Sequence, residues 1–199
     1  VAQAYQAASA SGGVPAMTWP SVEFTDGADG EGGGLGILRT GAGADQTVAL
    51  MKYGVHGLGH GHFDKLSLVF YDAGRTVLPD YGFARFVNVE PKYGGRYLPE
   101  NDSYAQHTIA HNTVVVDGRS QNDANQRQAD AMHADRHFFD GDGADGVQSV
   151  SASASGYYAG VDMQRTVVLL EDDAFEWPIL VDLYRLTSDA EHQYDYPLH

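Results

Sequence analysis

The chain has 199 residues, of which 43% are hydrophobic, so it can bury a core as one large domain or two small ones. Twelve lysine and arginine residues stand against 27 aspartate and glutamate residues, which gives a formal net charge of −15 at pH 7. Such a surface repels phosphate backbones and anionic membrane faces, so nucleic acid is not an expected partner. Because the chain has no cysteine, disulfides are excluded and any metal must be held by histidine or carboxylate ligands.

The first 13 residues are rich in alanine and end at a glycine pair, which predicts a short N-terminal helix or linker. No run of about 18 apolar residues occurs, so we expect no membrane span. The chain begins with valine and lacks a basic segment ahead of an apolar one. We therefore expect no signal peptide in the chain as it stands, and interpret it as processed or as part of a larger protein.

From residue 14 to residue 199 the sequence predicts one all-β domain, an antiparallel β-sandwich. Short runs rich in β-branched and aromatic residues recur roughly every 10 to 20 residues, without a long helical period between them. Several of them end in glycine or aspartate, which turns require. The runs cover residues 35–41, 47–54, 66–74, 76–82, 112–118, 147–155, 163–173 and 177–186.

Two polar segments interrupt this pattern. Residues 86–110 are long, polar and aromatic, and a loop of this length in a compact domain is usually functional or disordered. Its four aromatic side chains favour an ordered, functional loop. Residues 119–135 form a second polar loop, in which we expect little chemistry.

The stretch "HGLGHGH" places His56, His60 and His62 within seven positions. If "GHGHF" is extended, His60 and His62 project to the same side, because alternate residues of a strand share a face. Neutral imidazole is the commonest metal ligand. The alternative is an ordinary histidine-containing loop.

Two further residues could complete a metal site. Asp80 ends the strand-like run that follows the turn "DAG", and a hairpin there would bring Asp80 back towards His62. His111 opens another predicted strand. Two histidines and one aspartate from neighbouring strand ends would make a zinc site with one open position.

Other residues allow a catalytic or a structural interpretation. Tyr97 follows two glycines in "YGGRYLPEN", and phenolate chemistry would need its pKa lowered by cations or a metal. The alternative is a packed or surface aromatic residue. Arg85 could bind a carboxylate bidentately or form a surface ion pair. Asp64 and Lys65 could be a simple pair of neighbouring charges.

Several motifs in order resemble the heparinase II/III-like domain of polysaccharide lyases, and are most similar to the oligoalginate lyases. The motifs are "HGHFDKLSLVFYDAG", "LPDYGFARFVN", "GGRYLPENDSYAQHTIAHNTVVVDG" and "HQYDYPLH". The resemblance runs nearly without gaps from about Gly54 to Gly118. It implies a helical toroid followed by a β-sandwich, with the active site in the cleft between them. This chain is similar to the sandwich only, and is expected to be incomplete at its C-terminal end.

The resemblance also implies a metal site. His62, Asp80 and His111 match the family's ligands for a structural Zn²⁺ near the cleft.

The resemblance implies a substrate site beside that metal. Tyr97 matches a tyrosine that takes part in proton transfer, and His60 and Arg85 match residues that line the substrate site. An asparagine, a histidine and a second tyrosine of the family belong to the toroid and have no counterpart in this chain.

The function implied by the resemblance is β-elimination at the uronate C4–O bond of alginate or oligoalginate, giving an unsaturated uronate. One alternative is a zinc-stabilised β-sandwich that binds acidic polysaccharide without cleaving it. Another is a lyase that acts on heparin-like or hyaluronan-like glycosaminoglycan. The expected partners are the acidic saccharide and the toroid domain of the parent protein, with a homodimer left open. Family habit implies a periplasmic or secreted location.

Overall fold

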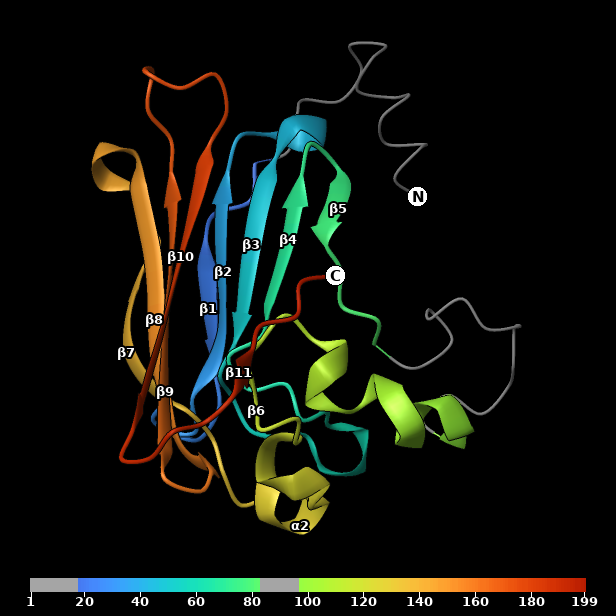
Figure 1. Ribbon diagram of the computed structural model, residues 1–199. Helices are drawn as coiled ribbons and strands as arrows, with labels where there is room; N and C mark the ends of the chain where they lie inside the picture. The colour runs from blue at the N-terminus through green and yellow to red at the C-terminus, as the bar shows by residue number, and fades with distance from the viewer. Residues whose placement is uncertain (1–17, 83–96) are drawn as a thin grey trace.

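The computed structural model describes residues 18–82 and 97–199, which form two antiparallel sheets packed face to face (Figure 1). The first sheet has the order β1-β2-β3-β4-β5 and the second the order β10-β9-β8-β7. The first consists of β1 (Val22–Thr25), β2 (Gly34–Thr40), β3 (Thr47–Lys52), β4 (Leu68–Asp72) and β5 (Arg75–Leu78). The second consists of β7 (Asp135–Asp140), β8 (Val147–Tyr158), β9 (Val161–Leu170) and β10 (Ile179–Ser188).

Alternation of buried and partly exposed side chains explains why these segments are strands. In β9 the odd-numbered residues from Val161 to Leu169 are buried and the even-numbered ones face outward. The buried side chains of β2 and β3, such as Leu38 and Met51, meet those of β9 in one hydrophobic core. Full burial of one such side chain stabilises the fold by roughly 1.5–3 kcal/mol.

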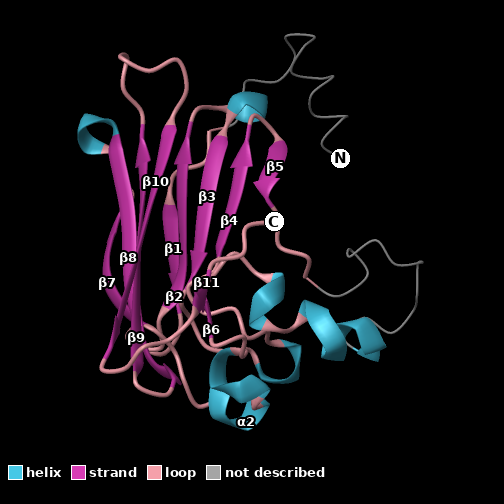
Figure 2. Ribbon diagram, in the orientation of Figure 1, coloured by secondary structure: helices cyan, strands magenta, loops and turns pink. Residues whose placement is uncertain are grey.

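A smaller sheet and several helical turns lie at one end of the first sheet (Figure 2). The smaller sheet pairs β6 (Val115–Val116) with β11 (Tyr194–Asp195). The turns are all short. Polar side chains in this region bind backbone groups, and such bonds compete with the backbone hydrogen bonds of a long helix. They are the 3₁₀ turns Leu58–His60, Thr108–Ala110 and Gln121–Ala124, the π-helical turn Asn101–Ala105 and helix α2 (Gln126–Ala129).

The predicted antiparallel β-sandwich is confirmed, with three corrections to its details. The run at residues 112–118 contributes only the two residues of β6, and before it the side chains of Asn112 and Thr113 bond to backbone carbonyl oxygens of Leu68 and Lys65. Strands β1 and β7 were not predicted. In β7 every residue is exposed or only partly buried, so the sequence lacks the alternation that marks a half-buried strand.

Two expectations concern residues at or beyond the limits of the description. The predicted helix at residues 1–13 lies outside the described residues. Of the predicted loop at 86–110, only residues 97–110 are described, and they contain the helical turns at Asn101–Ala105 and Thr108–Ala110. Within residues 18–82 and 97–199, no helix is long and apolar enough to cross a membrane.

Candidate metal and substrate site

The loop before β4 and the chain that leaves β5 lie at the same end of the first sheet. Strands β3, β4 and β5 run antiparallel, so the β3–β4 connection and the residues after β5 both emerge where β4 begins. Leu78 of β5 pairs with Phe70 of β4, and Asp80 follows two residues later. His62 lies in the β3–β4 connection. The hairpin therefore brings Asp80 back towards His62, as the sequence predicts.

The segment that carries His111 is fixed to this same end by its neighbour Asn112. The side-chain amide nitrogen of Asn112 donates to the carbonyl oxygens of Leu68 and Pro79, at 2.9 Å each. The backbone nitrogen of Leu68 in turn donates to the Asn112 carbonyl at 3.2 Å. One asparagine thus joins the start of β4, the chain after β5 and the segment at 111.

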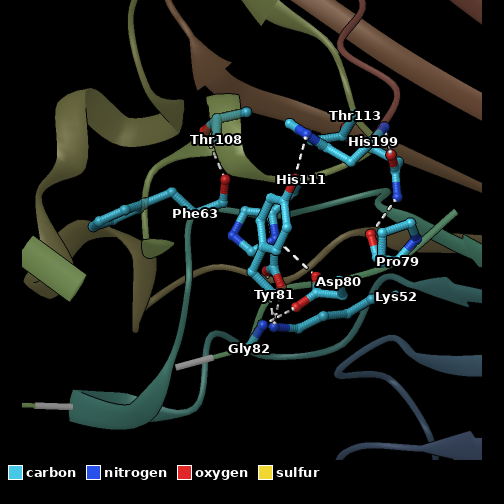
Figure 3. A network of polar contacts seen from close by, with 12 residues as sticks. Lys52, Phe63, Pro79, Asp80, Tyr81, Gly82, Thr108, His111, Thr113 and His199 are labelled. Carbon is cyan, nitrogen blue, oxygen red and sulfur yellow. Dashed lines mark hydrogen bonds and ion pairs between the residues drawn. The ribbon is translucent and has the colours of Figure 1, made fainter. Parts of the chain in front are cut away.

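His62, Asp80 and His111 form a compact cluster. Figure 3 shows Asp80 and His111 pointing toward each other. Each side chain offers one ligating atom, and these atoms lie within 4.8 Å of one another. The two imidazole ring centres are 5.2 Å apart, and Nδ1 of His111 lies 2.8 Å from Oδ2 of Asp80. His111 is fully buried and His62 is 8% exposed. The three residues that sequence analysis assigned to a metal therefore do converge.

The protonation of the cluster fits a divalent metal. Because the carboxylate oxygen of Asp80 can only accept, Nδ1 of His111 donates to it. The other ring nitrogen, Nε2, is buried and has no hydrogen-bonding partner among the described residues. Burial lowers the pKa of His62 to about 4, so its imidazole is neutral at pH 7, the form that ligates metals. Two histidines and one carboxylate are a common donor set for zinc.

The carboxylate of Asp80 is held in its charged form. Burial acts to raise its pKa, but the hydrogen bond and the charge of His111 outweigh burial, so the pKa lies below its ordinary value. The backbone nitrogen of Gly82 also donates to Asp80, at 2.7 Å. A charged, hydrogen-bonded carboxylate is what a metal ligand requires.

Asp64 and Lys65, which were expected to form a pair of neighbouring charges, each bind another partner. Asp64 pairs with Lys52, whose ammonium nitrogen lies 2.8 Å from the carboxylate. The buried Lys65 ammonium donates instead to the carbonyl oxygen of Gly54. Burial opposes the charged form of Asp64, but Lys52 outweighs it and lowers the pKa of Asp64. A second buried anion therefore lies two residues from His62.

His60 and His62 do not share a face, contrary to the expectation for an extended segment. His60 ends a 3₁₀ turn and is exposed, whereas His62 is buried. The glycine between them is required for space: a Cβ on Gly61 would lie 2.2 Å from the carbonyl oxygen of His56. The "HGH" motif thus sends one histidine inward to the cluster and one outward.

The outward histidine lines a hollow of about 280 Å³ together with Tyr97. The remaining lining comes from Gly57, Leu58 and Gly59. Tyr97 is 78% exposed, so its hydroxyl is accessible to a bound molecule. Two residues assigned to catalysis and substrate binding therefore lie together, while Arg85 lies outside the described residues.

Sequence analysis missed two residues that hold the cluster, Asn112 and His199. The backbone nitrogen of His199 donates to Oδ1 of Asn112 at 2.9 Å, and its ring lies beside Tyr81 (Figure 3). Their place within the family motifs was the only sequence signal for these two residues. Asn112 and His199 are 87 residues apart, and neither their residue types nor their spacing indicates that they are partners.

Fold and site together define a β-sandwich domain with a buried His–Asp–His cluster and a surface hollow lined by His60 and Tyr97. The family model described as "Heparinase II/III-like, C-terminal" matches residues 24–199. The chain belongs to this family.

Two curated relatives match most of the chain. It is 45% identical over 174 residues to an "Alginate lyase" of Stenotrophomonas maltophilia, covering 87% of this chain and 23% of that protein. It is 41% identical over 180 residues to an "Exo-oligoalginate lyase" of Saccharophagus degradans, covering 90% of this chain and 24% of that protein. The chain thus spans about a quarter of the length of these relatives.

Solved structures share the fold. A heparinase III structure matches with a TM-score of 0.63 at 18% identity, covering 94% of this chain and 25% of that chain. A heparan sulfate lyase from Pedobacter heparinus matches with a TM-score of 0.55 at 18% identity, covering 84% of this chain and 24% of that chain. At this identity the likeness concerns the fold alone.

Proposed function

We propose that this chain is the zinc-binding β-sandwich of a polysaccharide lyase that acts on alginate or oligoalginate. One observation carries the proposal: a buried His–Asp–His cluster and a hollow lined by His60 and Tyr97 occur in a chain 41–45% identical to two proteins named as alginate lyases. The substrate is an acidic polysaccharide, and cleavage is by β-elimination at the uronate C4–O bond.

Zn²⁺ would be held by His62, Asp80 and His111, and would supply structural cross-linking of the loops that border the hollow. The compact, buried cluster supports this role, because binding energy at a preformed site stabilises the fold. The outward position of His60 supports a different role for that residue, in contact with the saccharide.

The reaction moves two protons, one of them from carbon. A base removes the proton at C5, a double bond forms between C4 and C5, and the C4–O bond breaks with a proton delivered to the leaving oxygen. Tyr97 is assigned to proton transfer, because its phenol can act as base and then as acid. Its exposure at the rim of the hollow supports this assignment.

Charge at the carboxylate must be neutralised for C5 to lose its proton, because the transition state resembles an enolate. We assign Arg85 and His60 to substrate binding, and the neutralising asparagine and histidine to a helical toroid outside this chain. The expectations of a homodimer and of a periplasmic or secreted location stay predictions.

The test is the absorbance of the unsaturated uronate that β-elimination forms. Alginate, oligoalginate and heparin are each added to the chain, to a longer protein that contains it and, as a positive control, to the full-length Stenotrophomonas relative. We expect product from alginate or oligoalginate with a longer protein that contains this chain. Product from heparin alone would overturn the substrate assignment.

A second function is supported by the open hollow that His60 and Tyr97 line. In this function the sandwich binds acidic saccharide without cleaving it. Retention of alginate by the isolated chain without any absorbing product would identify this binding function.

A further inference from the structure

The C-terminal segment returns to the metal cluster from a distant part of the fold. Strand β11 pairs with β6, with Tyr194 opposite Val116 and Asp195 opposite Val115. This pairing directs the residues that follow back along the segment that carries His111 (Figure 1). His199 consequently lies beside the residues that flank the cluster.

His199 makes three hydrogen bonds to these flanking residues. Its backbone nitrogen donates to Oδ1 of Asn112 at 2.9 Å. Its ring nitrogen Nε2 lies 3.0 Å from the carbonyl oxygen of Ile109, and Nδ1 lies 3.1 Å from the hydroxyl of Tyr81. A carbonyl oxygen only accepts, so Nε2 donates to Ile109, while Nδ1 bonds to the hydroxyl of Tyr81. The hydrogen bonds thus fix the orientation of the ring.

These contacts reach both segments that carry the buried pair. Tyr81 directly follows Asp80, and Ile109 and Asn112 lie on the two sides of His111. The rings of His199 and Tyr81 also stack edge to face with centres 5.0 Å apart. His199 therefore spans the gap between the Asp80 segment and the His111 segment.

We infer that the imidazole of His199 is a positioning residue that sets the distance between Asp80 and His111, and thereby the affinity for the metal. This inference rests on the proposed zinc site. The ring of His199 hydrogen-bonds to Tyr81 and Ile109, the neighbours of the metal ligands, so its effect acts through these two residues. Groups that orient metal ligands in this way typically contribute about 10–100-fold to metal affinity.

The chain offers a matched control in His192, seven residues earlier in the same segment. Its Nδ1 lies 2.7 Å from Oδ2 of Asp117, at the turn after β6. His192→Ala therefore removes a histidine and a hydrogen bond from the same segment without touching Tyr81 or Ile109. His199→Gln keeps a side chain that can both donate and accept hydrogen bonds.

The first measurement is zinc affinity, by competition with a chromophoric chelator, for the native chain and the three variants. We expect His199→Ala to weaken zinc binding ~10–100-fold, His192→Ala to leave it unchanged and His199→Gln to recover most of it. Melting temperatures of the metal-free proteins are measured in parallel, since His199 is partly solvent-exposed and its loss should change them little. Equal zinc affinity of the native chain and His199→Ala would overturn the inference.

If the native chain binds no zinc, the proposed metal site is refuted. A second measurement then still tests whether His199 positions His111 relative to Asp80. In metal-free protein, NMR follows the Nδ1 proton of His111 that donates to Asp80. We expect slow solvent exchange of this proton in the native chain and in His192→Ala, and rapid exchange in His199→Ala. The same exchange rate in all three proteins would overturn the positioning role.

Discussion

Oδ2 of Asp80 lies 2.8 Å from Nδ1 of His111, and this contact joins the β4–β5 hairpin to the segment before β6. The histidine is fully buried, while the carboxylate side chain retains 27% of its exposure. The contact therefore cross-links two segments that are 31 residues apart at the edge of the core. The remaining nitrogen of His111 is buried without a partner among the described residues, which leaves a lone pair for a metal.

His111→Ala should destabilise the domain, and more strongly when zinc is present. Without metal the loss is about 1–3 kcal/mol, because a buried hydrogen-bonded group is removed and Asp80 loses its partner. With zinc the native chain gains binding energy that the variant cannot gain. Melting curves with and without Zn²⁺ measure both effects.

The control for this experiment is His133→Ala. His133 is exposed and lies 3.9 Å from Asp135, so its removal should leave the melting temperature unchanged. A melting curve of His111→Ala that matches the native curve in the presence of zinc would refute a structural metal site.

Acidification should destabilise the metal-free fold through His62. Burial lowers the pKa of His62 from 6.5 to about 4 in the folded chain. Between these two pH values the unfolded chain binds a proton at this residue and the folded chain does not. Stability is therefore fully present above about pH 6.5 and falls as the pH drops towards 4, by about 3 kcal/mol at most.

Urea unfolding of the metal-free protein across this pH range measures the effect, with His62→Gln as the comparison. The glutamine variant keeps a polar side chain but cannot take up the proton, so its stability should vary less with pH. Identical pH dependence in both proteins would show that His62 does not carry this proton uptake. Zinc affinity of the folded chain should fall only as the pH approaches 4, where protons begin to compete with the metal for the His62 imidazole.

Tyr97→Phe should abolish most turnover in a longer protein that contains this chain. Loss of a proton-transfer group typically lowers the rate by about 10²–10⁴-fold. Zinc content and melting temperature should stay unchanged, because the hydroxyl lies on a side chain that is 78% exposed. Tyr71→Phe, on strand β4, is the matched control and should keep full activity. Native-like turnover of Tyr97→Phe would exclude the residue from proton transfer.

The β-sandwich was predictable because its signals are local. Strands such as β3 and β9 alternate buried and outward residues over their whole length, and turns mark their ends. The approach of Asp80 to His62 was predictable for the same reason, since a hairpin joins neighbouring strands. Strand β7 was not, because its side chains have no buried face.

The polar contacts that hold the site could not be predicted, because each depends on residues brought together only by the complete fold. Asn112 binds Leu68 and Pro79, which are 44 and 33 residues away. His199 reaches the site only because β11 pairs with β6. In a single sequence such an asparagine or histidine has no pattern that distinguishes it from a surface residue.

Arg165 is the clearest case of a contact that the sequence does not reveal. It occupies an inward position of β9 and is fully buried. Its guanidinium binds both carboxylate oxygens of Asp182, at 2.8 and 2.7 Å, and donates to the carbonyl oxygens of Leu66 and Asn112 at 2.7 and 2.6 Å. Arg165→Met should therefore cost about 3–5 kcal/mol, because it removes the cation that pairs with Asp182 and one buried donor from each of the two carbonyl groups.

The matched control is Arg119→Ala. Arg119 pairs with Asp123 at 2.9 Å, but both side chains are exposed, so its loss should cost only about 0.2–1 kcal/mol. Urea unfolding of both variants measures the difference. A cost for Arg165→Met as small as that for Arg119→Ala would mean that water or a rearranged side chain replaces the buried contacts. Arg165 also donates to the backbone carbonyl of Asn112, which directly follows the metal ligand His111. Arg165→Met should therefore also weaken zinc binding.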